Sequence, residues 1–380
     1  MIEKSKFIFP VGYHKFHKKQ VFNFQLNRWY SLGYSSFEDI KDVGQKIKNF
    51  RDWITEMIKL AEKAESENRL ISAAFYYRAA EFYILQENNE KKKMYDEFSK
   101  LFYKAIEKDS VERFKIPYEE GFLPAIRIAP IGKKIGTLIV HGGFDSFIEE
   151  WYSPMRYFSD RGYEIIGFEG PGQGAAIRKY NLALEWKWEK PAKAILDYFK
   201  LDDVSWLGIS MGGWFCFRAA AYEPRIRRVI ASSIGYDYIG TMNIMLQKMH
   251  NLFLKRARNL SNKMLLKAIK KGEGMQAWQA AQLIYITKKD IPMDAFEVMM
   301  ELNAENLHSE MVKQDVLILT GRNDHFIPFR AHDMQIKALT NAKSITAKVF
   351  TKETQAHNHC QIGNIGLSLD IMEKWIKEKS

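Results

Sequence analysis

Ser210 is the residue whose surroundings most clearly predict chemistry, because it lies in the segment GISMGG at positions 208–213. The apolar segment 203–207 before it predicts a short buried strand, and the small and apolar residues 214–221 after it predict a helix. A strand, a G-x-S-x-G turn and a helix in this order are typical of a nucleophile elbow, whose strained turn exposes a serine hydroxyl above a sheet. We expect Ser210 to be a nucleophile; the alternative is a serine that only caps the helix.

A serine hydroxyl is a weak nucleophile at neutral pH, so it needs a base, and the base needs an acid that orients it. In enzymes with such an elbow these residues follow in the order serine, acid, histidine, each after a strand. Asp324 directly follows the predicted strand 316–320 and is the expected acid. Asp237, just after the predicted strand 227–233, is the alternative acid, and a turn or helix cap before Pro328 is the non-catalytic interpretation of Asp324.

Two histidines follow the last predicted strand, 345–350, and one of them is expected to be the base. They are His357 and His359, which are separated by a single residue. A metal-binding pair is the alternative, but a third ligand is not evident nearby in the sequence. Cys360 lies on no elbow, so we expect it to be a small buried side chain rather than a nucleophile.

An acyl-transfer reaction also needs backbone N–H donors for the developing oxyanion. One expected donor is the N–H of Met211, directly after the nucleophile. The other should come from the loop HGGFDS at 141–146, which follows the predicted strand 137–140 and resembles an H-G-G type of oxyanion loop. Gly143 or Phe144 can supply that donor, and Phe144 is preferred.

Four further residues near the ends of predicted strands are candidates for substrate contact. They are His141, Asp145, Glu169 and Asp237. His141 is expected to hydrogen-bond within its loop rather than to act as a general base. Glu169 begins the segment EGPGQG at 169–174, which is too short for a phosphate-binding P-loop and lacks its Lys-Ser/Thr pair, so no nucleotide site is expected. This segment is interpreted as a shaped loop near the mouth of the pocket.

The elements that would position these residues alternate between strands and helices from residue 111 onward. Two segments of period two, at 111–118 and 122–129, are joined by a glycine-containing turn and predict a β-hairpin. The later strands alternate with helices, which favours an α/β fold with a mostly parallel, doubly wound sheet. Residues 1–110 are predicted as an N-terminal helical domain, 111–380 as the catalytic domain, and about 236–314 as a helical cap insertion.

The composition bounds the class of protein. The chain has 380 residues, 46% of them hydrophobic, which is enough for a large core. Its net charge of +11 comes from basic residues scattered along helical segments, so neither nucleic acid nor a membrane is an expected partner. No signal segment or membrane span is recognisable, and the only cysteines, Cys216 and Cys360, suggest no disulfide framework. We expect a cytoplasmic protein.

Taken in order, these motifs resemble a subgroup of the α/β-hydrolase superfamily. The subgroup includes 2,6-dihydroxypseudooxynicotine hydrolase, fungal polyketide-shortening hydrolases and the fermentation–respiration switch protein group. The resemblance rests on the Ser210 elbow and on the segments YRAAE at 77–81, IPYE at 116–119, LP at 123–124, HGGFDS at 141–146, EGPGQG at 169–174 and HCQIGN at 359–364. The last segment places the base at His359. Glu169 departs from the pattern, since many such chains carry aspartate there.

The resemblance implies the α/β-hydrolase fold with a helical domain beside the catalytic domain, often in a homodimer, and no cofactor. It also implies cleavage of either an ester or a carbon–carbon bond next to a ketone. We therefore predict a serine hydrolase for a small-molecule carboxylic ester or a related carbonyl compound, with no metal site. The alternatives are a carbon–carbon bond hydrolase for a diketone-like or polyketide-like substrate, and a non-catalytic hydrolase-like binding protein.

Overall fold

A single eight-stranded sheet forms the centre of the molecule, with strand order β1-β2-β4-β3-β5-β6-β7-β8. The computed structural model describes residues 7–85, 89–241, 245, 247–249, 252, 257–272 and 274–380. The strands are β1 (Val111–Tyr118), β2 (Gly121–Ile128), β3 (Gly136–His141), β4 (Tyr163–Phe168), β5 (Val204–Ile209), β6 (Ile226–Ser232), β7 (Asp315–Gly321) and β8 (Ser344–Phe350). Strands β3 to β8 pair in parallel, and the β1–β2 hairpin joins antiparallel through β2. This sheet confirms the predicted fold class.

The central strands are apolar on both faces because helices cover both faces of the sheet. Successive residues of a strand point to opposite faces, so Trp206 of β5 packs in one hydrophobic cluster and Leu207 in the other. Helices α6 (Tyr152–Ser159) and α16 (Ile365–Lys379) cover the face to which Leu207 points. The opposite face is covered by α7 (Gly174–Tyr180), α8 (Glu189–Phe199) and α9 (Gly212–Tyr222). Helix α15 (Arg330–Ala338) lies between β7 and β8 in the chain.

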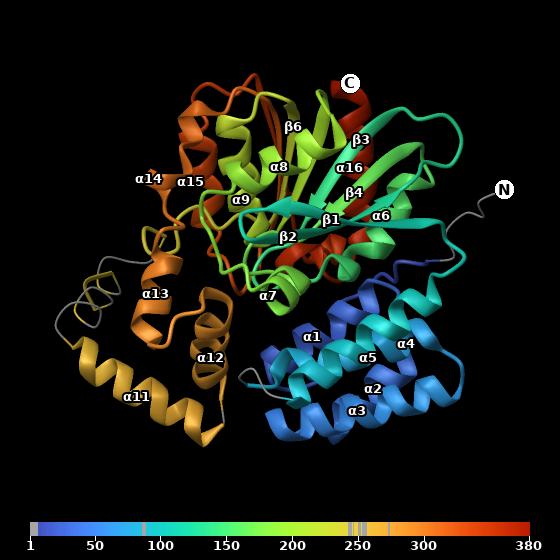
Figure 1. Cartoon of the computed structure of the whole chain (residues 1–380), viewed down its shortest axis with the longest axis vertical. Coiled ribbons are helices and arrows are strands. Elements are labelled where there is room, and N and C mark those ends of the chain that lie inside the picture. The colour runs from blue at the N-terminus through green and yellow to red at the C-terminus, as the bar shows by residue number, and fades with distance from the viewer. Residues whose placement is uncertain are drawn as a thin grey trace.

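Five helices precede the sheet in the chain and lie together beneath it (Figure 1). They are α1 (Gln20–Ser31), α2 (Phe37–Lys46), α3 (Phe50–Ser66), α4 (Leu70–Tyr83) and α5 (Asn89–Ala105). Helices α2 and α3 begin after the capping residues Ser36 and Asn49, whose side chains each accept a hydrogen bond from the backbone N–H three residues later. Helix α4 is buried from Ala73 to Tyr83, as expected of the helix at the centre of the group.

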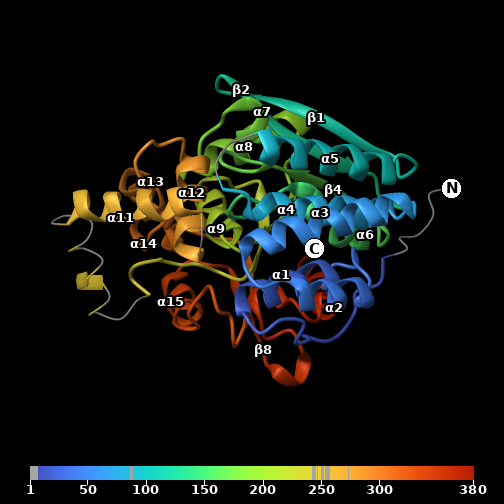
Figure 2. The same cartoon turned by 90° about the horizontal axis from the view of Figure 1, so that it is seen from below.

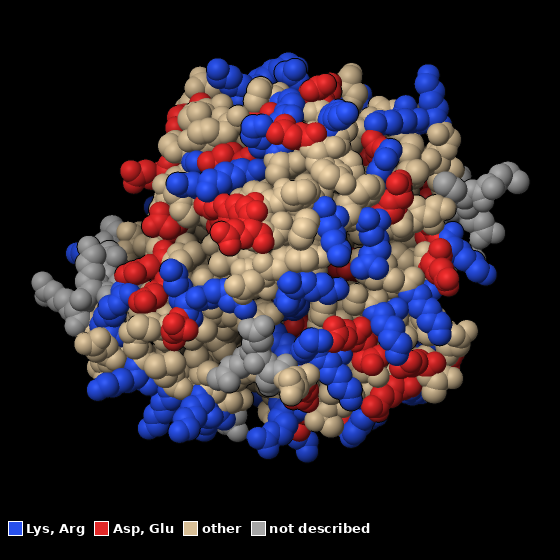
Figure 3. All heavy atoms as spheres, viewed as in Figure 1, with Lys and Arg blue, Asp and Glu red and all other residues tan. Residues whose placement is uncertain are grey.

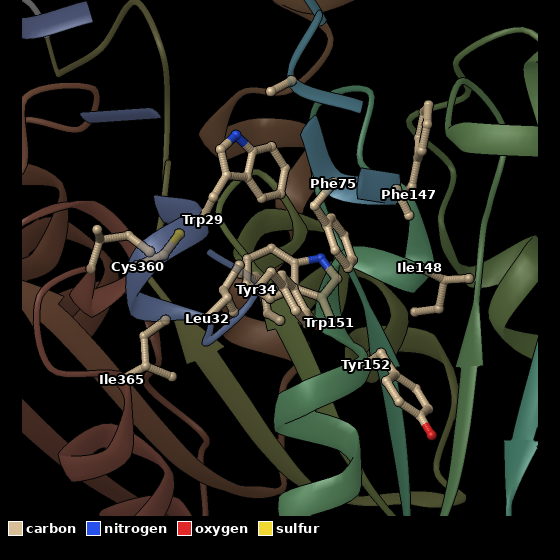
Figure 4. Packing of buried hydrophobic residues seen from close by; sticks show 14 of the residues in the cluster. Trp29, Leu32, Tyr34, Phe75, Phe147, Ile148, Trp151, Tyr152, Cys360 and Ile365 are labelled. Atoms are coloured by element: carbon tan, nitrogen blue, oxygen red, sulfur yellow. The ribbon is translucent and has the colours of Figure 1, made fainter. Parts of the chain in front are cut away.

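The N-terminal helices share a hydrophobic core with the sheet instead of enclosing a separate one. Figure 4 shows Trp29 of α1, Phe75 of α4 and Trp151, which follows β3, packed into one cluster. The rings of Tyr34 and Phe75 stack with their centroids 3.7 Å apart. Across the boundary, the ring of Phe102 of α5 lies edge-on to that of Tyr152 of α6, with centroids 5.4 Å apart, and such buried ring contacts stabilise the packing of the helices against the layer that covers the sheet. The two parts of the chain are therefore packed as one body around this core.

Further helices lie in the chain between β6 and β7, within the predicted insertion at 236–314. The described ones are α11 (Arg258–Lys271), α12 (Met275–Thr287), α13 (Pro292–Met300) and α14 (Ala304–Leu307). Part of the predicted insertion lies outside the described residues. Figures 1 and 2 both place α12 beside the N-terminal helices, and the indole N–H of Trp278 donates to the Phe82 carbonyl oxygen at 2.6 Å. Helices from two distant parts of the chain thus meet beneath the sheet.

The charged side chains do not gather into one basic patch on the face that Figure 3 shows. Lysine and arginine side chains there alternate with aspartate and glutamate. Many of the basic residues form surface ion pairs with acidic neighbours, such as Lys193 with Asp197 and Lys92 with Asp96. Within the described residues, no helix is both long enough and apolar enough to cross a membrane.

Candidate active site

Ser210 lies at a strained turn between β5 and α9. Its φ angle is +62°, a left-handed conformation that side-chain-bearing residues adopt at a cost of about 1–3 kcal/mol. The turn is held because the Ser210 N–H donates to the Ser232 carbonyl oxygen at 2.8 Å. A Cβ atom on Gly208 would lie 2.0 Å from the carbonyl oxygen of Gly212, so the turn has no room for a side chain there. The motif therefore builds the elbow that the sequence predicts.

A continuous chain of hydrogen bonds joins three side chains from three different strand ends. The Ser210 Oγ lies 2.7 Å from Nε2 of His359, and Nδ1 of His359 lies 2.7 Å from Oδ2 of Asp324. Asp324 follows β7, and His359 follows β8 at the start of a short 3-10 turn. Because the strands are parallel, their carboxyl ends meet at one edge of the sheet, where ligand sites of open α/β sheets lie.

The electrostatics of this group favour proton transfer between Ser210 and His359. Burial alone would lower the pKa of His359, but the adjacent carboxylate of Asp324 outweighs it and raises the pKa above its ordinary value of 6.5. Burial alone would raise the pKa of Asp324, but His359 and two backbone N–H groups hold it below 3.8. Asp324 is therefore ionised at neutral pH, and it makes the imidazole a stronger base.

The loop that carries His359 is fixed by polar contacts to β6. The Cys360 N–H donates to Oγ of Ser233 at 2.9 Å, and Oγ of Ser232 donates to the Gln361 side chain at 2.8 Å. Cys360 is buried in a left-handed conformation, with φ at +51°. His357, the alternative base, instead turns its ring toward Tyr13, with ring centroids 6.1 Å apart. Of the two histidines, only His359 contacts both Ser210 and Asp324 among the hydrogen bonds of the described residues.

The loop after β3 passes directly over the elbow. A Cβ atom on Gly143 would lie 2.6 Å from the backbone nitrogen of Met211, so glycine is required for this approach. The side-chain amide of Gln173 donates to the carbonyl oxygens of Gly142 and Gly143, at 2.8 and 2.9 Å. Within the described part of the chain, no hydrogen bond uses the N–H of Met211 or Phe144. Both donors are therefore free to bind an oxygen atom.

The four residues predicted to contact substrate lie outside the lining of the cavity described below. His141 is fully buried among aromatic rings, and burial lowers its pKa to about 4. Asp237 accepts hydrogen bonds from the backbone N–H groups of Gly240 and Ala304, and it makes no contact with His359 among the described hydrogen bonds. His141 therefore lies in the core, whereas Asp237 is half-buried and braces its own loop.

Asp145 and Glu169 also turn away from the cavity. Asp145 accepts two hydrogen bonds from Arg178, at 2.7 and 3.0 Å. Glu169 accepts hydrogen bonds from the backbone N–H groups of Ile148 and Ala175, at 3.0 and 2.6 Å. Burial and the neighbouring Glu149 raise the pKa of Glu169 to about 8, so it is protonated at neutral pH. Both carboxyl groups hold loops in place.

Ser210 and His359 open onto a cavity of about 430 Å³, a volume typical of small-molecule sites. The walls are mostly aromatic and aliphatic, and they come from widely separated parts of the chain. From the N-terminal helices come Phe24, Gln25, Arg28, Phe82 and Tyr83. From the helices between β6 and β7 come Met275, Trp278, Gln279, Leu283, Phe296 and Met299. The positions of Ser210, His359 and Asp324 at strand ends could be predicted from the sequence, but the contribution of α1 and α4 to this wall could not.

A buried ionic network ties the N-terminal helices to the loops of the active site. Arg78 of α4, fully buried, forms ion pairs with Glu81 and Glu150, and its guanidinium donates to the Asp145 carbonyl oxygen at 2.8 Å. Arg178 of α7 pairs with both Glu81 and Asp145, at 2.7 Å each. The segment YRAAE at 77–81 contains two members of this network, but their partners could not be predicted from the sequence.

His325, next to Asp324, is a polar residue of the cavity wall that sequence reasoning missed. Within the described part of the chain, neither of its buried ring nitrogens has a hydrogen-bond partner. Its ring packs against Phe24 and Phe326, with centroids 4.7 and 4.0 Å away. Burial and the neighbouring His359 lower the pKa of His325 to about 4, so the ring is neutral at pH 7 and offers one donor and one acceptor.

Comparison with known proteins places this geometry in a family. Residues 138–358, more than half of the chain, match the alpha/beta hydrolase fold family. Hydrolase acrC of Aspergillus aculeatus is 28% identical over 293 residues, 67% of each chain. The 20-hydroxy-prefusarin hydrolase FUS2 of Gibberella moniliformis is 27% identical over 365 residues, 82% of this chain and 84% of its own. Some other relatives are matched over less than two thirds of their length, as is hydrolyase ccsE of Aspergillus clavatus at 37%.

Among solved structures, the crystal structure of 2,6-dihydroxy-pseudo-oxynicotine hydrolase is similar with a TM-score of 0.65. The similarity covers 92% of this chain and 94% of that one at 21% identity, so it concerns the fold. It extends over the N-terminal helices as well as the sheet, because a match of 92% leaves few residues outside it. The chain is a hydrolase that belongs to the alpha/beta hydrolase fold family.

Proposed function

We propose that this protein is a serine hydrolase of a small carbonyl substrate, with Ser210 as nucleophile, His359 as general base and Asp324 as the orienting acid. The single observation that carries the proposal is the unbroken hydrogen-bonded chain from Ser210 through His359 to Asp324, at 2.7 Å per link. Its serine end opens onto an apolar cavity large enough for a small molecule.

In the proposed reaction, Ser210 Oγ attacks the substrate carbonyl carbon while His359 Nε2 accepts the hydroxyl proton. Asp324 stabilises the resulting imidazolium, which then gives the proton to the leaving group. Water repeats these steps in reverse roles and releases the acid product with Ser210 free. The N–H of Met211 and the N–H of Phe144 or Gly143 are proposed to bind the oxyanion in both halves of the reaction.

The test is covalent labelling with a fluorophosphonate probe, read by intact mass on the full chain. Ser210 in the wild type should gain one adduct, and Ser210→Ala should gain none. Hydrolysis of 4-nitrophenyl esters by Ser210→Ala should fall by about 10⁴-fold or more. Thr320→Ala offers a matched control, since its hydroxyl is buried beside His332 and outside the cavity. An adduct that persists in Ser210→Ala would refute the assignment.

Carbon–carbon bond hydrolysis is the second candidate function, and the observation that favours it is the aromatic wall of the cavity. Such a reaction expels a carbanion equivalent, which requires a conjugated substrate, and Phe24, Phe82, Trp151 and Trp278 can pack against one. With 1-phenylbutane-1,3-dione and water the products would be acetate and acetophenone, or benzoate and acetone. Detection of either pair of products by chromatography supports carbon–carbon bond hydrolysis. Hydrolysis of esters without cleavage of the diketone supports the esterase function instead.

Further expectations from the sequence, on location, oligomeric state and cofactors, remain proposals. We propose that the protein is a cytoplasmic homodimer that needs no cofactor or metal. Light scattering on the purified full chain measures the mass in solution, and a monomer would contradict the proposed dimer. The alternative of a non-catalytic binding protein would be favoured if Ser210 reacted with no probe and the chain hydrolysed no ester or diketone.

A further inference from the structure

Helix α1 presents a short polar segment to the active-site cavity, and that segment contains a formal charge. Phe24, Gln25 and Arg28 of this helix all line the cavity. Arg28 is the one lysine or arginine among the described lining residues, and no aspartate or glutamate is among them. A charge in a largely apolar wall is costly unless it has a partner or a ligand. What partners the Arg28 guanidinium therefore bears on what the cavity binds.

The guanidinium of Arg28 pairs with a single carboxylate, which it shares with a second guanidinium. It forms an ion pair with Glu150, and it donates to the Gln25 side-chain oxygen at 3.4 Å. The same carboxylate also accepts a hydrogen bond from Nε of Arg78 at 2.7 Å, and another from the Ser146 hydroxyl at 3.3 Å. Arg78 also pairs with Glu81, but Glu81 is itself shared with Arg178 and Lys91. Two guanidinium groups thus share this carboxylate, and the positive charge of Arg28 is incompletely neutralised.

The surroundings hold the Arg28 guanidinium in a fixed orientation. Its carbon lies 4.7 Å from the ring centroid of Trp29 and 5.8 Å from that of Trp151, which lines the cavity. Gln25 and Tyr83 lie beside it in the same wall. Burial raises the pKa of the Tyr83 hydroxyl, so it stays protonated; its hydrogen bond to the Val21 carbonyl oxygen is long, at 3.5 Å, and can be exchanged for one to a ligand. Guanidinium, amide and phenol groups together form a corner that can donate to an anion.

The spacing along α1 relates this corner to the catalytic group. The Phe24 ring lies 6.0 Å from the His359 ring, between centroids. Arg28 is one turn further along the same helix, a rise of about 6 Å. A substrate whose carbonyl is at Ser210 would therefore reach Arg28 through a linker of a few atoms. The apolar rings on both sides would pack against that linker.

We propose that Arg28, with Gln25 and Tyr83, binds a carboxylate on the substrate, a few atoms from the carbonyl that Ser210 attacks. This inference deepens the proposed function, because it concerns the substrate of the same cavity. A planar guanidinium binds a carboxylate through two parallel hydrogen bonds, and it does so most strongly where water is excluded. The N-terminal helices then act as the part of the protein that selects the substrate.

Equilibrium dialysis of the purified full chain tests the proposal without any need for catalysis. The ligands are 4-phenylbutanoate and its neutral amide, 4-phenylbutanamide, which have nearly the same shape. The wild type should bind the carboxylate more tightly than the amide. Arg28→Met should weaken carboxylate binding by about 10- to 100-fold and change amide binding by less than about 3-fold. Arg28→Lys should retain part of the preference, since it keeps the charge without the planar fork.

Arg69→Met is the matched control, because Arg69 belongs to the same group of helices but pairs with Asp39 and Glu67 outside the cavity. It should leave both dissociation constants unchanged. Circular dichroism melting of each variant shows whether the fold is retained. Equal binding of the two ligands by the wild type, no binding of either, or equal weakening of both in Arg28→Met and Arg28→Lys would overturn the proposal. A carboxylate preference that persists when Ser210 fails to react with the fluorophosphonate would refute the hydrolase mechanism and leave the anion site standing.

Discussion

Two polar assemblies lie within one body and differ in whether their side chains are suited to exchanging a proton. At the edge of the sheet, Ser210, His359 and Asp324 form a single chain in which the carboxylate raises the pKa of the imidazole. In the ionic network beneath, Glu81 accepts contacts from Arg78 and Arg178. Burial would raise the pKa of Glu81, but the surrounding cations lower it instead, so it stays ionised. One assembly is suited to exchanging a proton, and the other to keeping its charges fixed.

The comparison shows how the N-terminal helices become part of the active site. Removing several charges from water costs several kcal/mol per ion unless each ion is well paired. The network meets that condition because every carboxylate in it accepts from more than one cation or from a cation and a backbone or side-chain donor. The network extends from α4 to the loop after β3. It holds this loop, which passes over Ser210, in place. Fixed charges thus position the assembly whose protons move.

The largest expected effect is on activity alone. Asp324→Asn should lower kcat/KM for a hydrolysed ester by about 10⁴-fold, because an amide can neither orient the needed tautomer nor stabilise the imidazolium. Its free energy of unfolding should change by less than about 1 kcal/mol, since the hydrogen bonds from Phe326 and Ile327 can be kept. Urea denaturation followed by circular dichroism measures the second quantity. A loss of stability as large as the loss of activity would remove the distinction between the two assemblies.

A substitution in the ionic network should have the opposite effect and lower the free energy of unfolding first. Arg78→Met should lower the free energy of unfolding by about 3–5 kcal/mol, because it leaves Glu81 and Glu150 buried with fewer partners. The guanidinium also packs over the Phe147 ring, 3.6 Å from its centroid. Lys193→Met is the matched control: its pair with Asp197 lies at the surface and should be worth less than about 1 kcal/mol. Urea midpoints of both variants decide whether burial makes the difference.

Strand ends explain why the catalytic group could be predicted from the sequence. Parallel strands place their carboxyl ends at one edge, so Asp324 and His359 could be assigned from their positions after β7 and β8. The glycines around Ser210 predicted the turn, and the alternation of strands and helices predicted the sheet. These features follow from local pattern and chain order. They do not depend on which distant side chains meet.

The cavity wall and the network could not be predicted, because both depend on contacts between distant segments. Arg28 and Glu150 are 122 positions apart in the chain, and each looks like a surface residue in its own segment. The placement of His141 and Glu169 away from the cavity wall could not be predicted for a related reason. Their positions after strands indicated the correct loops, but only packing decides that these side chains turn into the core.

The pH dependence of Ser210 labelling sharpens the contrast in proton behaviour. Only neutral His359 can accept the serine proton, so the labelling rate should rise with pH through the pKa of His359. Because Asp324 raises that pKa, the midpoint of the rise should lie above pH 6.5. In Asp324→Asn the midpoint should move to lower pH while the rate falls at every pH. Second-order labelling rates from about pH 5 to about pH 10 measure it, and a wild-type midpoint below 6.5 would contradict the effect assigned to Asp324.

The smallest expected effect concerns His325, which stands between the two assemblies in character: polar and buried, but without partners among the described residues. His325→Phe removes two unpaired ring nitrogens and keeps an aromatic ring against Phe24, so the free energy of unfolding should rise by about 1 kcal/mol. His357→Phe, which removes one unpaired nitrogen, should give a smaller gain. Urea denaturation measures both. A gain in stability with weaker substrate binding would mean that His325 is a polar group held at the cavity wall for the ligand; a loss of stability would mean that its nitrogens are already satisfied by water.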